Sequence, residues 1–328
     1  MRGRTARREI AGAVRLLPAM TSASVSVPAV QPRRRGDTGR SFGWLMIAPC
    51  LAMLAANSIF PLIYAVTVAF ESYQVLIPVP HRFIGLRNFE RIFSDPLFWS
   101  SLGVTAWFIA GVVLLQFPVG FGLALLLNRL RRYQEMLATL LLIPTIISTS
   151  VAAFQWVQLF NYQFGPINYL LGLLHLPQPT WTADPALALP CLIFVDLWQW
   201  TPFMTLLMFA GLRSLPSSII DAARVDGSTA WQVVWRIYLP LLRPVIGIAL
   251  ILRILMAFKL FDIIYVLTSG GPGTVTENLA FFTYVQGFRY FNMGYAAALS
   301  LLQLIAVAVL AKLLIRLTRR ASAATAKE

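Results

Sequence analysis

The sequence contains few charged residues and few side chains that commonly bind metals. Of its 328 residues, 12% are charged and 58% are hydrophobic, and its two histidines, His81 and His175, lie far apart. A soluble domain of this composition would aggregate, so the sequence indicates an integral membrane protein. Because the histidines cannot form a local cluster, no metal site is expected.

Cysteines and nucleotide-binding motifs are also scarce. Cys50 and Cys191 each lie inside an apolar run, which predicts two buried small side chains and neither a disulfide bond nor a metal site. No GxxxxGK[ST] phosphate loop occurs, so the chain is not expected to bind ATP in that manner. Both histidines lie outside the apolar runs, which argues against a catalytic His and Asp constellation within a membrane-embedded enzyme.

Six apolar runs are long enough to cross a bilayer, which requires about 20 residues. The expected spans are residues 44–70, 102–127, 136–160, 186–212, 244–268 and 295–317. Prolines inside these runs are tolerated because neighbouring helices can satisfy the carbonyl groups that proline leaves free. The predicted fold class is therefore an all-α integral membrane protein with six transmembrane helices.

Basic residues are distributed unevenly between the two sides of the membrane that six spans define. The side that holds both termini carries 21 Lys and Arg in its loops and tails, whereas the opposite loops carry 4. Since Lys and Arg favour the cytoplasmic side, both termini and the central polar interval are predicted to be cytoplasmic. This asymmetry accounts for the net charge of +14 without a nucleic-acid partner.

The chain divides into one long apolar domain and two short tails. Residues 1–42 contain nine arginines and are expected to form a disordered tail near an anionic membrane surface. A signal peptide is a weaker interpretation, because Arg15 interrupts the short apolar stretch of this tail. Residues 43–320 are expected to form the transmembrane domain, and residues 321–328 a second cytoplasmic tail.

A polar interval, 214–240, separates the fourth and fifth runs. Ser214 and Pro216 predict the start of a helix, Gly227 predicts its left-handed end, and Ser228 can cap a second helix. The second helix is expected to carry one apolar face, formed at helical spacing by Trp231, Val234, Trp235 and Tyr238. The predicted helix-turn-helix either docks on a partner protein or lies on the membrane surface.

The same interval contains a spaced motif. Its members are Asp221, Ala222, Ala223, Gly227, Ile237, Leu239 and Pro240. This pattern resembles the EAA signature of the permease subunits of bacterial ABC importers, with Asp221 in place of the family's Glu. In that family the segment is a coupling helix region that docks on the ATPase subunit. The resemblance implies a docking surface that also includes Arg224 and Asp226, on which a partner protein can approach closely over the two alanines.

Three other stretches, 88–99, 267–272 and 287–296, resemble sequences of the sugar permeases in this family, which include maltose, trehalose and glycerol-3-phosphate permeases. Residues 88–93 are also expected to form a short amphipathic helix at the outer interface. The resemblance implies a subunit that moves a di- or oligosaccharide, such as trehalose or maltose, into the cytoplasm by alternating access.

The resemblance also implies a set of partners. These are a second homologous permease, two copies of an ABC ATPase subunit, an extracytoplasmic sugar-binding lipoprotein and membrane lipid, without nucleic acid. ATP and Mg would be bound by the ATPase subunit, so this chain would hold no cofactor and no catalytic residues. The expected location is the bacterial inner membrane.

Four ionisable residues lie within or near the predicted spans. Each costs about 2.5–3.5 kcal/mol at the centre of a membrane helix, so these side chains should pair or face a cavity. Lys259 and Asp262 are spaced for a local ion pair and are expected to line the translocation path. Asp196 and Arg253 either clamp helices together or contact the substrate, and the clamp is the favoured interpretation.

Aromatic rings beside amide groups suit sugars, whose C–H faces stack and whose hydroxyls need directional partners. Together with the resemblance, this chemistry gives the candidate pathway residues Gln155, Trp198, Phe258, Lys259 and Asp262. The alternative for the tryptophans is a belt at the membrane interface. The alternative function is an ion-coupled secondary transporter, which would use intramembrane acids and internal repeats, and no repeat is evident.

Overall fold

The structure is a computed structural model that describes residues 38–76, 81–130 and 132–325. Helix α2 (Thr38–Ala69) crosses the boundary between two compact units, Met1–Asn57 and Ser58–Glu328. Of the tail predicted for residues 1–42, residues 1–37 lie outside the described part, and residues 38–42 form the start of α2. At the other end, α15 (Met293–Thr325) continues into the segment predicted as a tail, of which residues 326–328 lie outside the described part.

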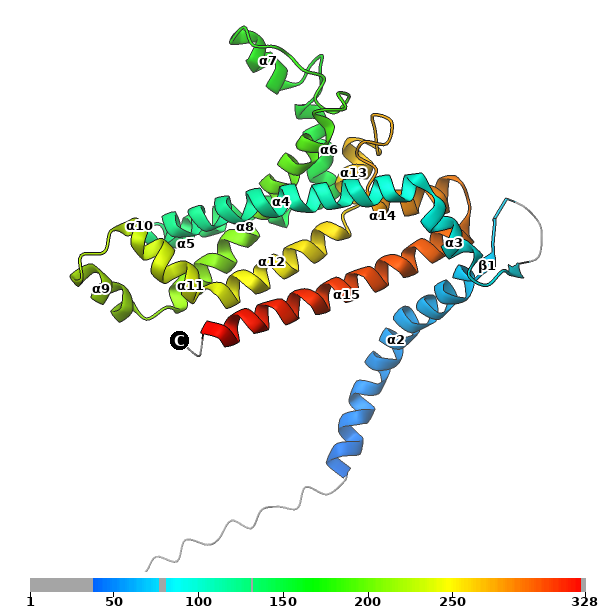
Figure 1. The fold of residues 1–328 in the computed structure, drawn as a ribbon, viewed down its shortest axis with the longest axis horizontal. Helices are drawn as coiled ribbons and strands as arrows, with labels where there is room; N and C mark the ends of the chain where they lie inside the picture. Colours follow the sequence, from blue (N-terminus) through cyan, green and yellow to red (C-terminus); the bar gives the residue numbers. More distant parts are fainter. Residues whose placement is uncertain (1–37, 77–80, 131, 326–328) are drawn as a thin grey trace, which may run out of the picture. The chain divides into compact units, whose positions relative to one another are not determined.

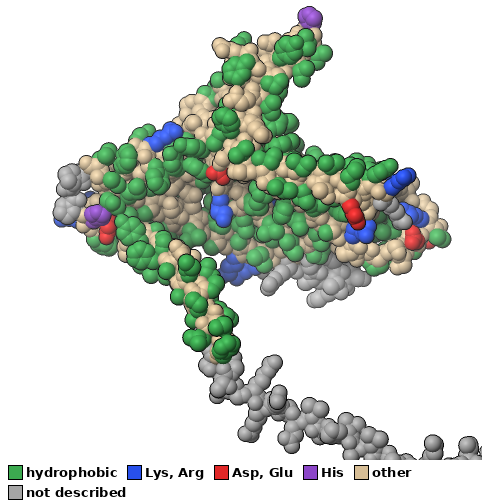
Figure 2. Space-filling view, turned by 180° about the vertical axis from the view of Figure 1, so that it is seen from behind, with side chains coloured by type: hydrophobic (Ala, Val, Ile, Leu, Met, Phe, Trp, Pro, Cys, Tyr) green, Lys and Arg blue, Asp and Glu red, His purple; other side chains and the backbone are tan. Residues whose placement is uncertain are grey.

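Four described helices are apolar and long enough to cross a membrane, and up to six spans result if two bent helix pairs each count as one. The long helices are α2, α4 (Pro96–Arg129), α8 (Ala188–Ser214) and α15. Helices α4, α8, α12 and α15 pack together as a bundle in the second unit (Figure 1). Hydrophobic side chains cover most of the face in Figure 2, and charged groups occupy only small patches of it.

The predicted third span is bent and not straight. It consists of α5 (Gln134–Ile146) and α6 (Thr149–Leu159), which meet at an angle of 88°. Gln199 of α8 stabilises the break, because its side-chain Nε2 donates to the carbonyl oxygen of Ile147 at 3.0 Å and its backbone carbonyl accepts from the Thr145 hydroxyl at 2.9 Å. Backbone groups freed inside a membrane protein need such partners.

The predicted fifth span also differs from the expected continuous helix. Helix α12 (Arg243–Phe258) ends before Lys259, and a separate short helix, α13 (Asp262–Leu267), packs against α6. The side chain of Asn278 donates to the Leu260 carbonyl at 2.6 Å and so satisfies the broken backbone. The sequence pattern alone does not reveal this break, because its stabilising group lies in a distant loop.

Short elements connect the long helices. Helix α3 (Arg87–Ser94) confirms the helix expected at 88–93, and Asn88 fixes it by donating to the carbonyls of Ala69 and Glu71. The remaining short elements are β1 (Glu71–Ser72) and β2 (Arg82–Phe83), which pair antiparallel, α7 (Pro166–Leu173), α14 (Leu279–Tyr284) and the π-helical turn η2 (Val285–Arg289). Apart from this strand pair, the predicted all-α class is confirmed.

The two cysteines differ in solvent exposure. Cys191 on α8 is buried as predicted, whereas Cys50 on α2 is exposed, and both are free. The prediction of burial is wrong for Cys50 because an apolar run in a membrane protein can face lipid as readily as protein.

One of the core clusters supports the polar interval between α8 and α12. Met204, Met208 and Leu212 of α8 pack there with residues of the interval, among them Ala223 and Tyr238. Gly211 allows this close packing, since a Cβ at its position would lie 2.9 Å from a Leu242 methyl group. The interval is thus held to the bundle by burial of one side.

Candidate functional site: the helix-turn-helix between α8 and α12

The interval folds as a helix, a glycine turn and a second helix, as predicted. The first helix, α9 (Ser217–Val225), ends where the amides of Gly227 and Ser228 donate to the carbonyls of Arg224 and Ala223. Gly227 has a φ of 78°, in the left-handed region that other residues rarely adopt. Because a Cβ at Gly227 would meet no atom within 4 Å, the turn requires glycine for its backbone angle and not for space.

The second helix begins one residue later than expected. Thr229, and not Ser228, is the N-cap: its hydroxyl accepts from the Gln232 amide, and its amide donates to the Gln232 side chain. This reciprocal capping box satisfies two amides at the helix start. The helical segment then runs through α10 (Ala230–Val233), the π-helical turn η1 (Val234–Tyr238) and α11 (Leu239–Leu241).

The apolar face predicted for this segment is split in two. Tyr238 is buried against the bundle together with Val233, whereas Trp231 and Trp235 are 69% and 54% exposed. The two indole rings contact each other edge to face, with centroids 5.4 Å apart. A π-helical turn contains an extra residue per turn, which shifts Tyr238 out of line with the tryptophans. The i, i+3, i+4 spacing assumed a regular α-helix, so that prediction is wrong.

Helix α9 carries an outer apolar stripe that the sequence analysis missed. Ile219, Ala222 and Val225 are exposed at a spacing of three residues, and Val225 is 88% exposed. Ala223 is buried against the bundle, so only one of the two alanines faces outward. The stripe follows from the three-residue spacing of its members, a signal that was available in the sequence.

Charged groups flank the stripe. Asp221 and Arg224 form an ion pair 3.6 Å long between carboxylate and guanidinium, and both side chains are about two-thirds exposed. Exposed pairs of this kind add at most about 1 kcal/mol to stability, so both charges remain available to a partner. Asp226 is exposed beside Gly227 at the tip.

The last residues of the motif lie against the bundle. Ile237 and Leu239 are partly buried against the core cluster, and Pro240 lies within α11. Because proline has no amide hydrogen, Pro240 cannot continue the regular α-helical ladder, and the Leu239 amide donates to the Val234 carbonyl in the π pattern. These three residues fix the orientation of the segment more than they extend its outer surface.

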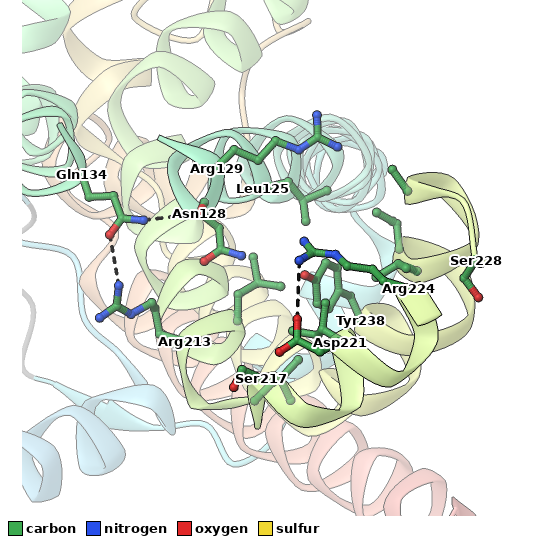
Figure 3. Close-up of a pocket in the computed structure, with 16 residues that line it drawn as sticks. Leu125, Asn128, Arg129, Gln134, Arg213, Ser217, Asp221, Arg224, Ser228 and Tyr238 are labelled. Atoms are coloured by element: carbon green, nitrogen blue, oxygen red, sulfur yellow. Dashed lines mark hydrogen bonds and ion pairs between the residues drawn. The ribbon is translucent and has the colours of Figure 1, made fainter. Parts of the chain in front are cut away.

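A cavity of about 730 Å³ separates the interval from the ends of α4, α5 and α8 (Figure 3). Arg213 and Gln134 lie on one side of it, joined by a hydrogen bond of 3.1 Å, and Asp221 and Arg224 lie on the other. Arg129 also lines the cavity, so three of the four charged side chains in its lining are basic. The helix-turn-helix is therefore supported along one side only, which leaves the outer side of α9 free for a partner.

The five predicted pathway residues occupy different environments. Gln155 on α6 is exposed, and Trp198 on α8 is half-buried against Trp156, with ring centroids 5.6 Å apart. Phe258 is buried in a core cluster, so its ring is packed among other side chains. Lys259 and Asp262 are both exposed, at the break between α12 and α13.

The predicted ion pair between Lys259 and Asp262 is not formed in the described structure. The i, i+3 spacing assumed that both residues share one helix, whereas α12 ends at Phe258 and α13 begins at Asp262. The packing of α13 on α6 nevertheless brings the helices that carry Gln155 and Asp262 together.

A buried polar cluster connects α4, α8 and α12. Arg253 forms an ion pair with Asp196, its Nε donates to Gln116 at 2.5 Å, and its guanidinium lies 5.9 Å from the ring centre of Trp200. Asp196 and Arg253 are at most 1% exposed, which supports the predicted helix clamp. Gln116 was missed because it lies inside an uninterrupted apolar run.

No group of three or more His, Cys, Asp or Glu side chains in the described part of the chain is arranged to hold a metal ion.

A sequence model of one family, described as "Binding-protein-dependent transport system inner membrane component", matches residues 13–324. The trehalose/maltose transport system permease protein MalF of Thermococcus litoralis is 37% identical over 252 residues, which cover 77% of this chain and 84% of that protein. The trehalose transport system permease protein SugA of Mycobacterium tuberculosis is 34% identical over 280 residues, which cover 85% and 89%.

The fold is similar to that of a solved bacterial ABC transporter involved in the import of the acidic polysaccharide alginate. The TM-score is 0.77 at 22% sequence identity, and the match covers 87% of this chain and 97% of the other. A second structure of a bacterial alginate ABC transporter, in complex with an alginate pentasaccharide-bound periplasmic protein, gives a TM-score of 0.75 at 22% identity, over 87% of this chain and 98% of the other.

Proposed function

Because this chain belongs to the family of binding-protein-dependent transport system inner membrane components, we propose that it is the permease subunit of an ATP-driven importer that carries a di- or oligosaccharide into the cytoplasm. The observation that carries this proposal is the helix-turn-helix of α9 and α10. It is held to the bundle on one side and presents an outer apolar stripe flanked by charges on the other. A rigid element of this kind can transmit the movement of a motor subunit to the bundle.

The outer side of α9 is proposed as the docking surface for an ABC ATPase subunit. Ile219, Ala222 and Val225 supply apolar contact, and Asp221, Arg224 and Asp226 supply charges around it. ATP and Mg belong to that separate subunit, of which two copies act on this chain and a second homologous permease. An extracytoplasmic binding protein delivers the sugar, as the alginate transporter with its periplasmic protein suggests for this fold.

The sugar is proposed to pass the breaks in the third and fifth spans. Gln155, Trp198 and Asp262 lie on the helices that meet there, and Lys259 lies at the break itself; the two charged residues are exposed. Broken helices of this kind line cavities in other transporters, because their free backbone groups need polar surroundings. Phe258 supports this region from within the core. The names of the relatives point to trehalose or maltose as the first sugars to test.

The chain is proposed to lie in the bacterial inner membrane with both termini in the cytoplasm. The uneven distribution of Lys and Arg supports this orientation, and it places the helix-turn-helix on the side where ATP is available. An ion-coupled carrier is not favoured. Asp196, the acid buried at membrane depth, already forms an ion pair with Arg253, so its carboxylate is not free to bind a coupling ion.

Co-purification from the native membrane, followed by mass spectrometry, tests this assembly. We expect a second permease and an ATPase subunit to accompany the wild-type chain. The matched variant is Val225→Asp, which places a charge on the outer stripe of α9 and should reduce the amount of ATPase but not of the second permease. Recovery of the wild-type chain without any ATPase subunit would contradict the proposed function.

A further inference from the structure

The segment Ala230–Leu241, formed by α10, η1 and α11, packs on the bundle with one side and runs at a steep angle to the next helix. It meets α12 at an angle of 70°, and α12 packs beside α4 and α15, which are both long enough to span a bilayer. Membrane helices tilt by about 20° on average from the bilayer normal. A segment turned by 70° from a helix of this tilt therefore lies nearer to the membrane plane than to the bilayer normal.

The side of this segment that faces away from the bundle carries a pair of tryptophans. Trp231 and Trp235 are more than half exposed and contact each other, while Val233 and Tyr238 on the opposite side are buried. Neither indole N–H donates to a partner within the described part of the chain. Tryptophan is enriched at membrane–water interfaces, where its ring contacts acyl chains and its N–H reaches polar headgroups.

The charges of the segment and of the first residue of α12 complement an anionic lipid surface. Arg236 and Arg243 are exposed, and no ion pair in the described residues engages either of them. The stretch 229–243 contains no Asp or Glu, whereas α9 carries the exposed Asp221 and the turn after it the exposed Asp226. Basic residues near the surface of an anionic leaflet are attracted to it, and their alkyl stems can lie along apolar surface.

We propose that Ala230–Leu241 is an interfacial anchor. Trp231 and Trp235 insert at the boundary between headgroups and acyl chains, and Arg236 and Arg243 contact lipid phosphates. The choice of the cytoplasmic leaflet rests on the proposed orientation of the chain. The two halves of the helix-turn-helix then have different partners: α9 contacts a protein, and the tryptophan segment contacts lipid.

The anchor determines how movement of α9 passes through the Gly227 turn. One side of the segment packs on the bundle and the other contacts lipid, so both contacts restrict its position relative to the membrane. Movement of α9 is then transmitted to the bundle through Ala230–Leu241, which cannot rotate freely about its own axis. A basic, tryptophan-bearing helix lying in the interface plane has the composition of known interfacial anchors.

Site-directed spin labelling measures the depth of this segment directly. The purified chain, with the subunits that accompany it, is placed in nanodiscs that contain phosphatidylglycerol. Cys50→Ser and Cys191→Ala remove the native thiols, and Trp235→Cys or Trp231→Cys introduces a label site. Val225→Cys is the matched control, because it lies on the same helix-turn-helix and its label stays outside the lipid whether water or the ATPase subunit covers it.

We expect labels at positions 231 and 235 to be several-fold more accessible to oxygen, which concentrates in lipid, than to a water-soluble nickel chelate. The control label at position 225 should not share this preference for oxygen. Greater access to nickel at 235 would show that the tryptophan side faces water, and shielding from both reagents would show that protein covers it. Either result overturns the proposal.

A second measurement does not need the thiol substitutions. Fluorescence of the otherwise unmodified protein is recorded in nanodiscs with lipids brominated near the headgroup, and compared with that of the Trp231→Phe and Trp235→Phe double variant. We expect the quenched part of the signal to fall in the variant, and an unchanged quenched part would contradict the anchor. Because both readouts report depth alone, the anchor can fail while sugar import and ATPase assembly stand.

Discussion

Arg253 on α12 and Asp196 on α8 form an ion pair within the bundle, with both side chains at most 1% exposed. The two residues lie 57 positions apart in the sequence, and Gln116 of α4 joins them through the Arg253 Nε. One polar cluster thus connects three helices of the bundle. In an apolar bundle, where packing surfaces resemble lipid, such polar contacts help to specify helix arrangement.

Removal of one partner of this pair should destabilise the bundle. Arg253→Met leaves the Asp196 carboxylate buried without a counter-ion, which costs about 3–5 kcal/mol. We expect a lower unfolding temperature in detergent, measured by tryptophan fluorescence. Lys259→Met is the matched control, since it removes an exposed cation just beyond the same helix. Full stability of Arg253→Met together with lost transport would instead assign the arginine to substrate contact.

Substitution of Gly227 should separate folding from coupling. The left-handed angle costs an ordinary residue about 1–2 kcal/mol, and proline cannot adopt it at all. We expect Gly227→Pro to insert normally into membranes but to uncouple ATP hydrolysis from uptake, as measured in proteoliposomes. Gly227→Asn should keep most activity, because asparagine tolerates this backbone region. Normal uptake by the proline variant would contradict the coupling role of the turn.

The charge of Asp221 should influence assembly with the ATPase subunit. Asp221→Lys reverses an exposed charge beside the outer stripe of α9 and breaks its pair with Arg224. We expect less ATPase subunit to co-purify, without loss of the permease from the membrane. Val275→Lys places the same new charge in a partly exposed loop after α13 and serves as the control. Equal recovery from both variants would mean that Asp221 lies outside the contact.

Lys259 should matter more for sugar uptake than for assembly. It is exposed at the break between α12 and α13, and no ion pair in the described residues includes it. We expect Lys259→Ala to change the concentration dependence of uptake while the subunits still co-purify in normal amounts. If assembly declined and uptake per assembled complex stayed constant, Lys259 would have a structural role.

The sequence was sufficient for those features that depend on local chemistry or on length. Apolar runs predicted the long helices, and Gly227 predicted the turn that its φ of 78° requires. The distance between Asp196 and Arg253 could not be computed from the sequence, but the cost of two charges at membrane depth favoured their pairing.

Features that depend on distant partners were not predictable in this way. The break after Ile146 is stabilised by Gln199, and the break after Phe258 is stabilised by Asn278, neither of which is local. The π-helical turn that separates Tyr238 from the tryptophans changes the helical period itself, so a regular pattern gave the wrong face. A continuous apolar run therefore predicts a span but not its straightness.

Uptake of a radiolabelled sugar into proteoliposomes that contain the co-purified subunits tests the central claim most directly. The sugar is supplied with its binding protein, and the energy source is either ATP on the side of the helix-turn-helix or an ion gradient without ATP. We predict accumulation of trehalose or maltose that requires both ATP and the binding protein and is lost in the Gly227→Pro variant. Accumulation driven by the ion gradient, without ATP, would contradict the account.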